Sequence, residues 1–276
     1  MEDIYFINGE YKKLEDPQIT PDNIGLLRGY GIFEFFRTYN GKFFRFEEHM
    51  DRLFNSAKKM NIDLSYTRND IELISKKLKD KNKLKECSIR VVVTGGRVTS
   101  HTGYDPKKPT FMVLCQKSKS LPKEYYEKGV ELLTLEHQRI LPEVKYTNYI
   151  LPISKKKELR EKDKFDFLYV YNGKVLESVT SNLFLVKNKT LITPKEGVLA
   201  GTTREFVIEL AKDQIKVKRR EVKVKELEEA DEAFITATTK EILPVVKVDD
   251  LKIGEGRVGK ATKKLMKIFK REVSSF

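Results

Sequence analysis

One lysine in this chain differs from the others in its surroundings. Lys145 lies within residues 141–149, where Val144 and Tyr146 flank it and several other side chains are apolar or aromatic. Burial disfavours the charged form of an amine, and a neutral amine can form a Schiff base with a carbonyl compound. Lys145 is therefore a candidate nucleophile. Frequency alone favours an exposed lysine, because Lys and Arg make up 54 of the 276 residues and such residues are rarely buried.

A second chemical feature is a glycine–threonine turn at the start of a helical pattern. Gly201 is followed by Thr202 and Thr203, and residues 203–212 have the apolar spacing of a helix. Backbone N–H groups, hydroxyl groups and the helix dipole at such a start converge on an anion. The same residues can also form an ordinary helix cap, because this pattern is common.

The first half of the chain contains the patterns that must position Lys145 and its neighbours. Asn8-Gly9 beside apolar residues predicts a two-residue hairpin. The loop 95–109 carries two adjacent glycines and two prolines, and its length suggests a functional role. The other predicted elements are helices at residues 46–60 and 70–79 and strands at residues 88–94 and 110–116.

The second half is rich in strand patterns. Asn172-Gly173 predicts another hairpin. Two helices are predicted, at residues 203–212 and 260–272. The predicted strands are residues 130–136, 167–171, 174–177, 182–187, 190–193 and 232–236.

These elements predict an α+β protein of two domains, with mostly antiparallel strands and helices on the outside. Residues 118–128 are polar, contain Pro122 and separate the two patterned halves. We therefore predict a small N-terminal α+β domain over residues 1–118, a linker over residues 119–129 and a larger C-terminal domain over residues 130–276.

Composition excludes several classes of protein. The net charge is +13, but the basic residues are interleaved with 41 Asp and Glu, which favours a solvated surface over nucleic-acid binding. Cys87 and Cys115 are expected to be reduced core thiols, and the three scattered histidines predict no metal site. Apolar runs are far shorter than the roughly 20 residues of a membrane span. The acidic and apolar start carries no secretory signal pattern, so we expect a soluble, cytoplasmic protein.

Six motifs in order along the chain resemble the class IV, or fold type IV, aminotransferases. Lys145 begins a K-x-x-N motif, and Glu177 follows some thirty residues later with an S-N-x-F segment at 181–184. Residues 199–204 are similar to the family's L-x-G-x-T-R. The resemblance covers nearly the whole chain and continues in residues 28–34, 49–53 and 234–239.

The resemblance implies a pyridoxal 5′-phosphate enzyme whose C-terminal domain binds the cofactor and whose Lys145 is the catalytic lysine. Glu177 would pair with the pyridine nitrogen and keep it protonated, and Tyr149 would donate to the phenolic oxygen. Taken alone, a glutamate at a strand end is usually solvated and an interior tyrosine usually packs. The implied phosphate ligands are the N-terminus of the helix at Thr202 and Thr203, the guanidinium of Arg52, and the hydroxyl of Thr238 from a strand-to-helix turn.

Substrate choice depends on departures from the family pattern. Arg28 stands where branched-chain enzymes usually have a tyrosine, and Arg90 lies on the strand at residues 88–94. Together they could grip a carboxylate, as in a less common subgroup of D-amino acid aminotransferases, although either could instead form a salt bridge. We also expect Thr239 to contact substrate. Phe33, Glu34 and Arg37 resemble the corresponding residues of the branched-chain enzymes. Better-known D-amino acid enzymes have an R-x-H pair after this strand, but Arg97 and His101 are at the wrong spacing.

Several functions therefore remain open. The first is a transaminase acting on D-alanine or D-glutamate with 2-oxoglutarate. The second is a branched-chain L-amino acid transaminase. A third is a lyase of the aminodeoxychorismate type, which shares the K-x-x-N lysine, and a fourth is a binding protein that kept the fold without the chemistry. The expected partners are small amino and keto acids, with neither nucleic acid nor membrane. The resemblance also implies a homodimer in which the loop 95–109 reaches the neighbour's site.

Overall fold

The computed structural model describes residues 3–16 and 19–276, and it divides the chain into two compact units. The first unit runs to Ser118 and also includes Val144–Asn148 and Phe276. The second unit comprises Lys119–Glu143 and Tyr149–Ser275. Two boundaries therefore differ from the prediction. The expected linker 119–129 belongs to the second unit and contains a helix, α4 (Lys123–Lys128), and Lys145 lies on a segment that returns to the first unit.

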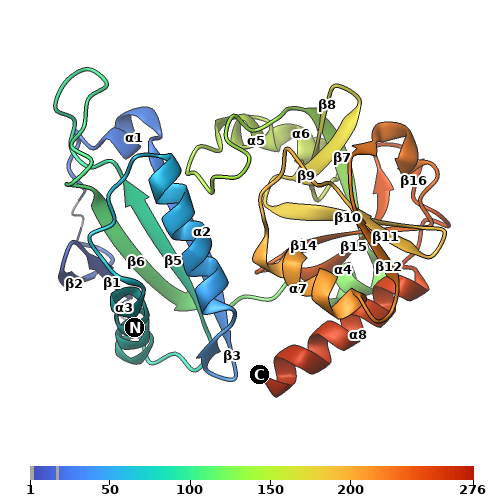
Figure 1. Cartoon of the computed structure of the whole chain (residues 1–276), viewed down its shortest axis with the longest axis horizontal. Helices are drawn as coiled ribbons and strands as arrows, with labels where there is room; N and C mark the ends of the chain where they lie inside the picture. Colours follow the sequence, from blue (N-terminus) through green and yellow to red (C-terminus); the bar gives the residue numbers. More distant parts are fainter. Residues whose placement is uncertain (1–2, 17–18) are drawn as a thin grey trace. The chain divides into compact units, whose positions relative to one another are not determined.

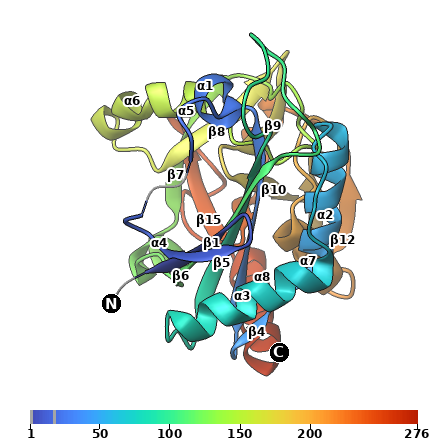
Figure 2. The same ribbon diagram turned by 90° about the vertical axis from the view of Figure 1, so that its left-hand side faces the viewer.

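The first unit is a six-stranded sheet with the strand order β2-β1-β6-β5-β3-β4. Helices α2 and α3 pack on one of its faces (Figures 1 and 2). Its strands are β1 (Ile4–Ile7), β2 (Glu10–Lys13), β3 (Gly31–Tyr39), β4 (Lys42–Phe43), β5 (Cys87–Thr94) and β6 (Thr110–Lys117). Its helices are α1 (Ile24–Arg28), α2 (Phe46–Lys59) and α3 (Arg68–Lys81).

Local sequence explains these elements. Asn8-Gly9 forms the two-residue turn of the β1–β2 hairpin, with positive φ at both positions. Thr67 and Asp70 form a capping box that begins α3. Strand β3 alternates, so that Phe36 is fully buried and contacts the rings of Phe43 and Phe46 edge to face, with ring centroids 5.3 and 5.4 Å away. Neighbouring residues of β3 therefore point to the opposite face.

The segment Val144–Asn148 extends the edge of β3. Phe33 donates its backbone N–H to the carbonyl of Lys145 at 2.8 Å, and Thr147 donates to the carbonyl of Gly31 at 2.9 Å. Between them Ile32 pairs with Tyr146 in an antiparallel bridge. The backbone of Lys145 is thus held by β3 through strand-like hydrogen bonds.

The second unit is built on a sheet that closes on itself. Its strands follow the order β12-β11-β10-β14-β15-β7-β8-β9-β13, and β10 also pairs with β9. The extra pairing closes a ring of six strands, in the order β9, β10, β14, β15, β7 and β8. Each strand of the ring therefore has a paired neighbour on both sides. The strands are β7 (Val130–Glu136), β8 (Asp166–Tyr171), β9 (Lys174–Ser178), β10 (Ser181–Lys187), β11 (Thr190–Thr193), β12 (Lys216–Arg219), β13 (Val222–Lys223), β14 (Glu232–Ala237), β15 (Glu241–Val248) and β16 (Leu251–Lys252).

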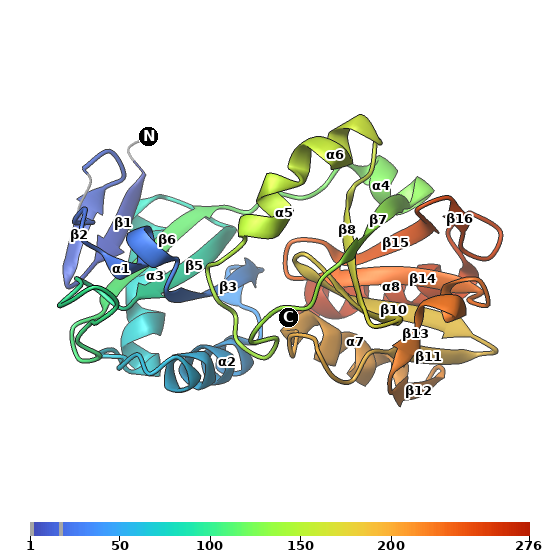
Figure 3. The same ribbon diagram turned by 90° about the horizontal axis from the view of Figure 1, so that it is seen from above.

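Apolar side chains from the ring strands form one buried cluster, which includes Leu132, Leu168 and Ile235. Helices α7 and α8 pack against each other and against β14 (Figure 3). The helical segments of the second unit besides α4 are α5 (Ile150–Ser154), α6 (Lys156–Glu161), α7 (Thr202–Ala211), α8 (Lys260–Ser275) and the short 3-10 turn Val224–Leu227.

Within the described ranges, no helix is both long and apolar enough to cross a membrane.

Candidate active site

Lys145 is half-buried and lies against an aromatic ring of its own unit. Its Nζ atom is 4.6 Å from the ring centroid of Phe33. Its backbone N–H donates to Ser56 Oγ at 3.3 Å, and its carbonyl accepts from Phe33. The backbone is therefore fixed on both sides by β3 and α2, while the side chain reaches the face of β3 that carries Phe33.

Arg52 of α2 is bound by a buried glutamate. Its Nε and Nη2 atoms donate to the two carboxylate oxygens of Glu34 at 2.9 and 2.6 Å. His49 Nδ1 lies 3.0 Å from the same carboxylate. Burial would raise the pKa of Glu34, but the charge and hydrogen bonds of Arg52, with those of His49, hold this pKa far below its usual range. The bidentate partner of Arg52 in this structure is thus Glu34, which fixes the direction of the guanidinium.

The two arginines predicted to bind substrate are both exposed side chains of the first unit. Arg28 ends α1, and its Nη1 donates to the carbonyl of Leu27 at 2.9 Å. Arg90 lies across two rings of β3, 5.5 Å from Phe33 and 5.3 Å from Phe35. Among the described residues, neither arginine forms an ion pair with a carboxylate, and no contact joins the two.

The other basic residues near that loop have separate positions. Arg97 is exposed and forms an ion pair with Asp22 at 2.7 Å, and His101 is exposed at the tip of the loop. Arg37 lies over the ring of Tyr39 at 4.6 Å. None of these contacts assigns a chemical role.

Glu177 is the penultimate residue of β9, beside the β9–β10 turn, and is 5% exposed. Arg139 Nε donates to Glu177 Oε1 at 2.9 Å. The side-chain amide of Asn182 and the backbone N–H of Leu199 donate to Glu177 Oε2 at 3.2 and 3.0 Å. Arg139 also donates to the carbonyl of Pro142. The carboxylate is thus held by three segments of the second unit that are separate in sequence.

The N-terminus of α7 carries the glycine and the two threonines. Thr202 and Thr203 are both buried. A Cβ atom added at Gly201 would lie 2.0 Å from Asn182 Oδ1, so any side chain at this position would displace Asn182. In the same turn Arg204 is 4% exposed, and its Nε has no hydrogen-bond partner among the described residues. Burial lowers the pKa of this guanidinium. These features fit a buried anion site.

Thr238 and Thr239 lie in the turn that joins β14 to β15. The predicted strand-to-helix turn was therefore wrong, because the chain returns as another strand of the ring. Thr238 is half-buried and Thr239 is exposed. Tyr149 is half-buried and precedes α5. Burial, with Asp166, Tyr149 and Glu177 nearby, raises the pKa of Tyr169.

Two residues of these clusters had no role in the sequence analysis. Arg139 and Arg204 are both buried arginines, at 8% and 4% exposure. Arg204 stands inside the L-x-G-x-T-R motif, so its position in the motif was a usable signal. Arg139 lies in no motif, and only the fold brings it to Glu177, 38 residues away.

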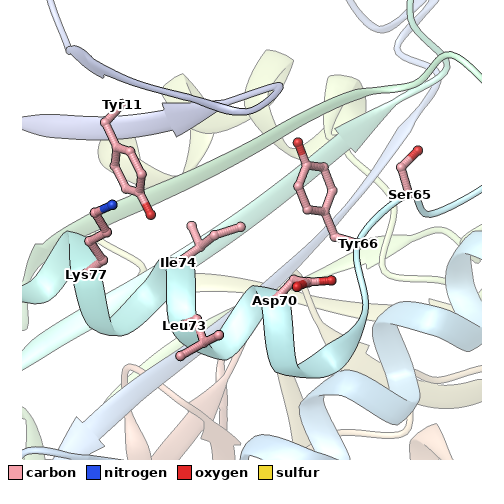
Figure 4. A pocket seen from close by; sticks show the side chains of 7 residues that line it. All are labelled: Tyr11, Ser65, Tyr66, Asp70, Leu73, Ile74 and Lys77. Carbon is pink, nitrogen blue, oxygen red and sulfur yellow. The ribbon is translucent and has the colours of Figure 1, made fainter.

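A groove of about 450 Å³ on the first unit is formed by other residues (Figure 4). None of the predicted site residues lines it. Its lining residues are Tyr11, Ser65, Tyr66, Asp70, Leu73, Ile74 and Lys77.

Residues 31–248 match the family model of amino-transferase class IV. The chain belongs to the class IV aminotransferases. It is 35% identical to a putative branched-chain-amino-acid aminotransferase of Methanocaldococcus jannaschii, over 96% of this chain and 94% of that protein. It is 31% identical to a D-alanine aminotransferase of Staphylococcus epidermidis, over 98% of both.

The fold comparison agrees with the sequence. A branched-chain amino acid aminotransferase from T.th., solved with pyridoxamine 5′-phosphate, is similar with a TM-score of 0.92 and 26% identity, over 100% of this chain and 95% of that one. The prediction of a two-domain fold type IV protein is confirmed. As in its class, the cofactor of this aminotransferase is pyridoxal 5′-phosphate.

Proposed function

We propose that this aminotransferase moves an amino group between a D-amino acid, such as D-alanine or D-glutamate, and 2-oxoglutarate. One observation carries the proposal: Arg28 and Arg90 make no ion pair with a carboxylate among the described residues. The chain has 41 acidic side chains that could neutralise them. Two unneutralised guanidinium groups on one unit are suited to a carboxylate substrate.

Arg90 and the proposed catalytic lysine share an aromatic ring. Phe33 lies 5.5 Å from the Arg90 guanidinium and 4.6 Å from Lys145 Nζ. The Phe33 ring therefore sets the spacing between Arg90, the proposed carboxylate site, and Lys145, which would transfer the Cα proton. That spacing supports Arg90 as the α-carboxylate site of an amino acid.

We assign the remaining roles by the chemistry of each side chain. Lys145 carries the cofactor and moves the proton at the substrate Cα. Glu177 holds a proton on the pyridine nitrogen, since its carboxylate is fixed and buried. Thr202, Thr203 and Thr238 bind the phosphate together with Arg52, whose guanidinium Glu34 orients. Tyr149 donates to the phenolic oxygen, and Thr239 contacts substrate. When bound, the cofactor supplies the electron sink for the carbanion at Cα.

A preference for branched-chain L-amino acids is the second candidate. The M. jannaschii relative, at 35% identity, is named a putative branched-chain enzyme. Phe33 and Phe35 are half-buried on the same face of β3, and such rings would also accept an apolar side chain. Both substrate classes carry an α-carboxylate, so kinetics with D- and L-amino acids must separate the two functions.

The test is kcat/KM for D-alanine, D-glutamate, L-leucine and L-valine, with 2-oxoglutarate as acceptor. Wild type should prefer the D-amino acids. Arg28→Ala should lose about 2 to 5 kcal/mol in kcat/KM, as for other truncated charge pairs. Arg271→Ala is the control, because Arg271 is an exposed arginine of α8 paired with Glu272. A wild type that favours L-leucine, with Arg28→Ala nearly neutral, would select the branched-chain function.

We also propose a homodimer in which the loop 95–109 contacts the neighbouring subunit. The loop is anchored in its own unit by Tyr104, whose hydroxyl lies 3.0 Å from that of Tyr30 and donates to the carbonyl of Asn61 at 3.1 Å. Its tip at residues 100–102 is exposed. Light scattering that gives the mass of one chain would contradict this assembly.

A further inference from the structure

A buried lysine with no assigned role joins two loops of the second unit. Lys240 is 9% exposed and directly follows the turn residues 238–239. Its backbone N–H donates to the carbonyl of Ala237 at 3.1 Å, which closes that turn. Its Nζ donates to Thr180 Oγ1 at 2.6 Å and to Ser181 Oγ at 2.9 Å. One side chain thus ties the β14–β15 turn to the tip of the β9–β10 hairpin.

The β9–β10 hairpin presents different residues on its two faces. Glu177 pairs with Asn182, and Ser178 pairs with Ser181. Directly paired residues point to the same face, and successive residues alternate. Glu177 and Asn182 therefore lie on one face, where their side chains are hydrogen-bonded at 3.2 Å. The two serines lie on the opposite face, toward Lys240.

Asp166 completes the support of the serine face. Its Oδ2 accepts from Ser178 Oγ at 2.6 Å and lies 4.0 Å from Lys240 Nζ. Burial lowers the pKa of Lys240 against the effect of Asp166, and burial raises the pKa of Asp166 against the effect of Lys240. A buried pair at this distance is a weak source of stability. Its hydrogen bonds, however, hold the hydroxyl groups at both ends of the hairpin tip.

We propose that Lys240 is a positioning residue of the cofactor site, which sets the direction of Glu177 relative to Thr238 through the hairpin tip. The inference rests on the role proposed above for Glu177. Without the ammonium group, the hydroxyls of Thr180 and Ser181 lose a buried donor, and the tip gains freedom to move. Ser178 and Ser181, at the two ends of the tip, directly adjoin Glu177 and Asn182. Movement of the tip would therefore leave Glu177 in a less defined geometry relative to the pyridine nitrogen.

The test compares Lys240→Met with Lys164→Met in the cofactor-loaded enzyme. Lys164 is a matched control, since its side chain is 10% exposed against 11% for Lys240 and it is paired with Glu131 in the same unit. Lys240→Met should weaken pyridoxal phosphate binding about tenfold, as for other residues that orient a ligand-binding group. It should also change the visible circular dichroism of the bound cofactor, which reports the cofactor's orientation. Lys164→Met should change neither.

Thr180→Val keeps the buried charge and removes one of its hydrogen bonds. It should change the dichroism in the same direction and weaken binding by a smaller factor, and it decides the question if Lys240→Met does not fold. Wild-type binding and dichroism in Thr180→Val and in any folded Lys240→Met would overturn the inference, as would an equal change in Lys164→Met. If Glu177→Gln left the dichroism and the rate of Cα proton transfer unchanged, the role of Glu177 itself would fail.

Discussion

Two buried glutamates, one in each unit, are both bound by an arginine. Glu34 of β3 is fully buried and binds Arg52 through both carboxylate oxygens. Glu177 of β9 is 5% exposed and accepts a hydrogen bond from Arg139 Nε at Oε1. The residue type, the burial and the type of partner are thus alike in the two units.

The two carboxylates differ in the segments that supply their other hydrogen-bond partners. Glu34 also accepts from its neighbour's backbone N–H, at Phe35, and lies against His49. All these partners lie on β3 or α2. Glu177 accepts from Asn182 of β10 and from Leu199 in the loop before α7. Glu34 thus anchors one helix to one strand, whereas Glu177 joins segments of the second unit that are separate in sequence. Burial and charge alone therefore do not distinguish an anchoring glutamate from the proposed partner of the cofactor nitrogen.

The largest expected effect comes from breaking the anchor. Glu34→Gln leaves the Arg52 guanidinium buried without its counterion, so it should lower the free energy of unfolding by about 3 to 5 kcal/mol at pH 7. Because the folded pKa of Glu34 lies below its unfolded value of roughly 4.3, this stabilisation is present above that pH. It is lost as the pH falls toward the folded pKa. The difference between wild type and variant should therefore narrow in acid, as measured by urea unfolding at several pH values.

The matched control is Glu48→Gln. The Glu48 side chain is 46% exposed and pairs with Arg45, the N-cap residue of α2, at 2.9 Å, so its loss should cost less than about 1 kcal/mol. Equal stabilities of wild type and Glu34→Gln would show that Glu34 is no anchor.

A smaller effect, on rate, is expected at the second glutamate. Glu177→Gln keeps a hydrogen-bonding side chain of the same size but cannot hold the proton on the ring nitrogen. It should leave the cofactor bound and slow Cα proton transfer on the order of 10²-fold, since a fixed electrostatic partner is lost. Stopped-flow measurement of the first half-reaction is the test, and an unchanged rate would remove Glu177 from the mechanism.

Local patterns predicted many of the elements, because short-range physics determines them. Asn8-Gly9 and Asn172-Gly173 form the expected hairpin turns with positive φ at each position. The helix predicted at residues 46–60 is α2, and its apolar face is buried.

Long-range pairings were outside the reach of these patterns. The parallel pairing of β15 with β7 joins Val245 to Val130, and no local signal encodes such a contact. Strand β15 was not predicted, because it contains Pro244 and proline is rare inside strands. Pro244 is accommodated because the pairing with β7 begins only at the following residue.

Residue type and motif order led to the candidate site residues. The contacts that hold those residues in place were not predicted. Lys145, Glu177 and the threonines at Thr202 and Thr203 were chosen from motifs. The return of Val144–Asn148 to the first unit depends on backbone pairing with β3, which side-chain patterns do not record. Lys240 was not predicted either, because the chain contains many lysines and the sequence does not show which of them the fold buries.

The central claim is that Lys145 carries the cofactor, and reductive trapping tests it most directly. The enzyme is loaded with pyridoxal phosphate, reduced with borohydride, digested and mapped by mass spectrometry, with Lys145→Ala treated in parallel. We expect one phosphopyridoxyl label, on Lys145, and no label in the variant. A label on another lysine of the wild-type enzyme, or an unlabelled protein, would contradict the account.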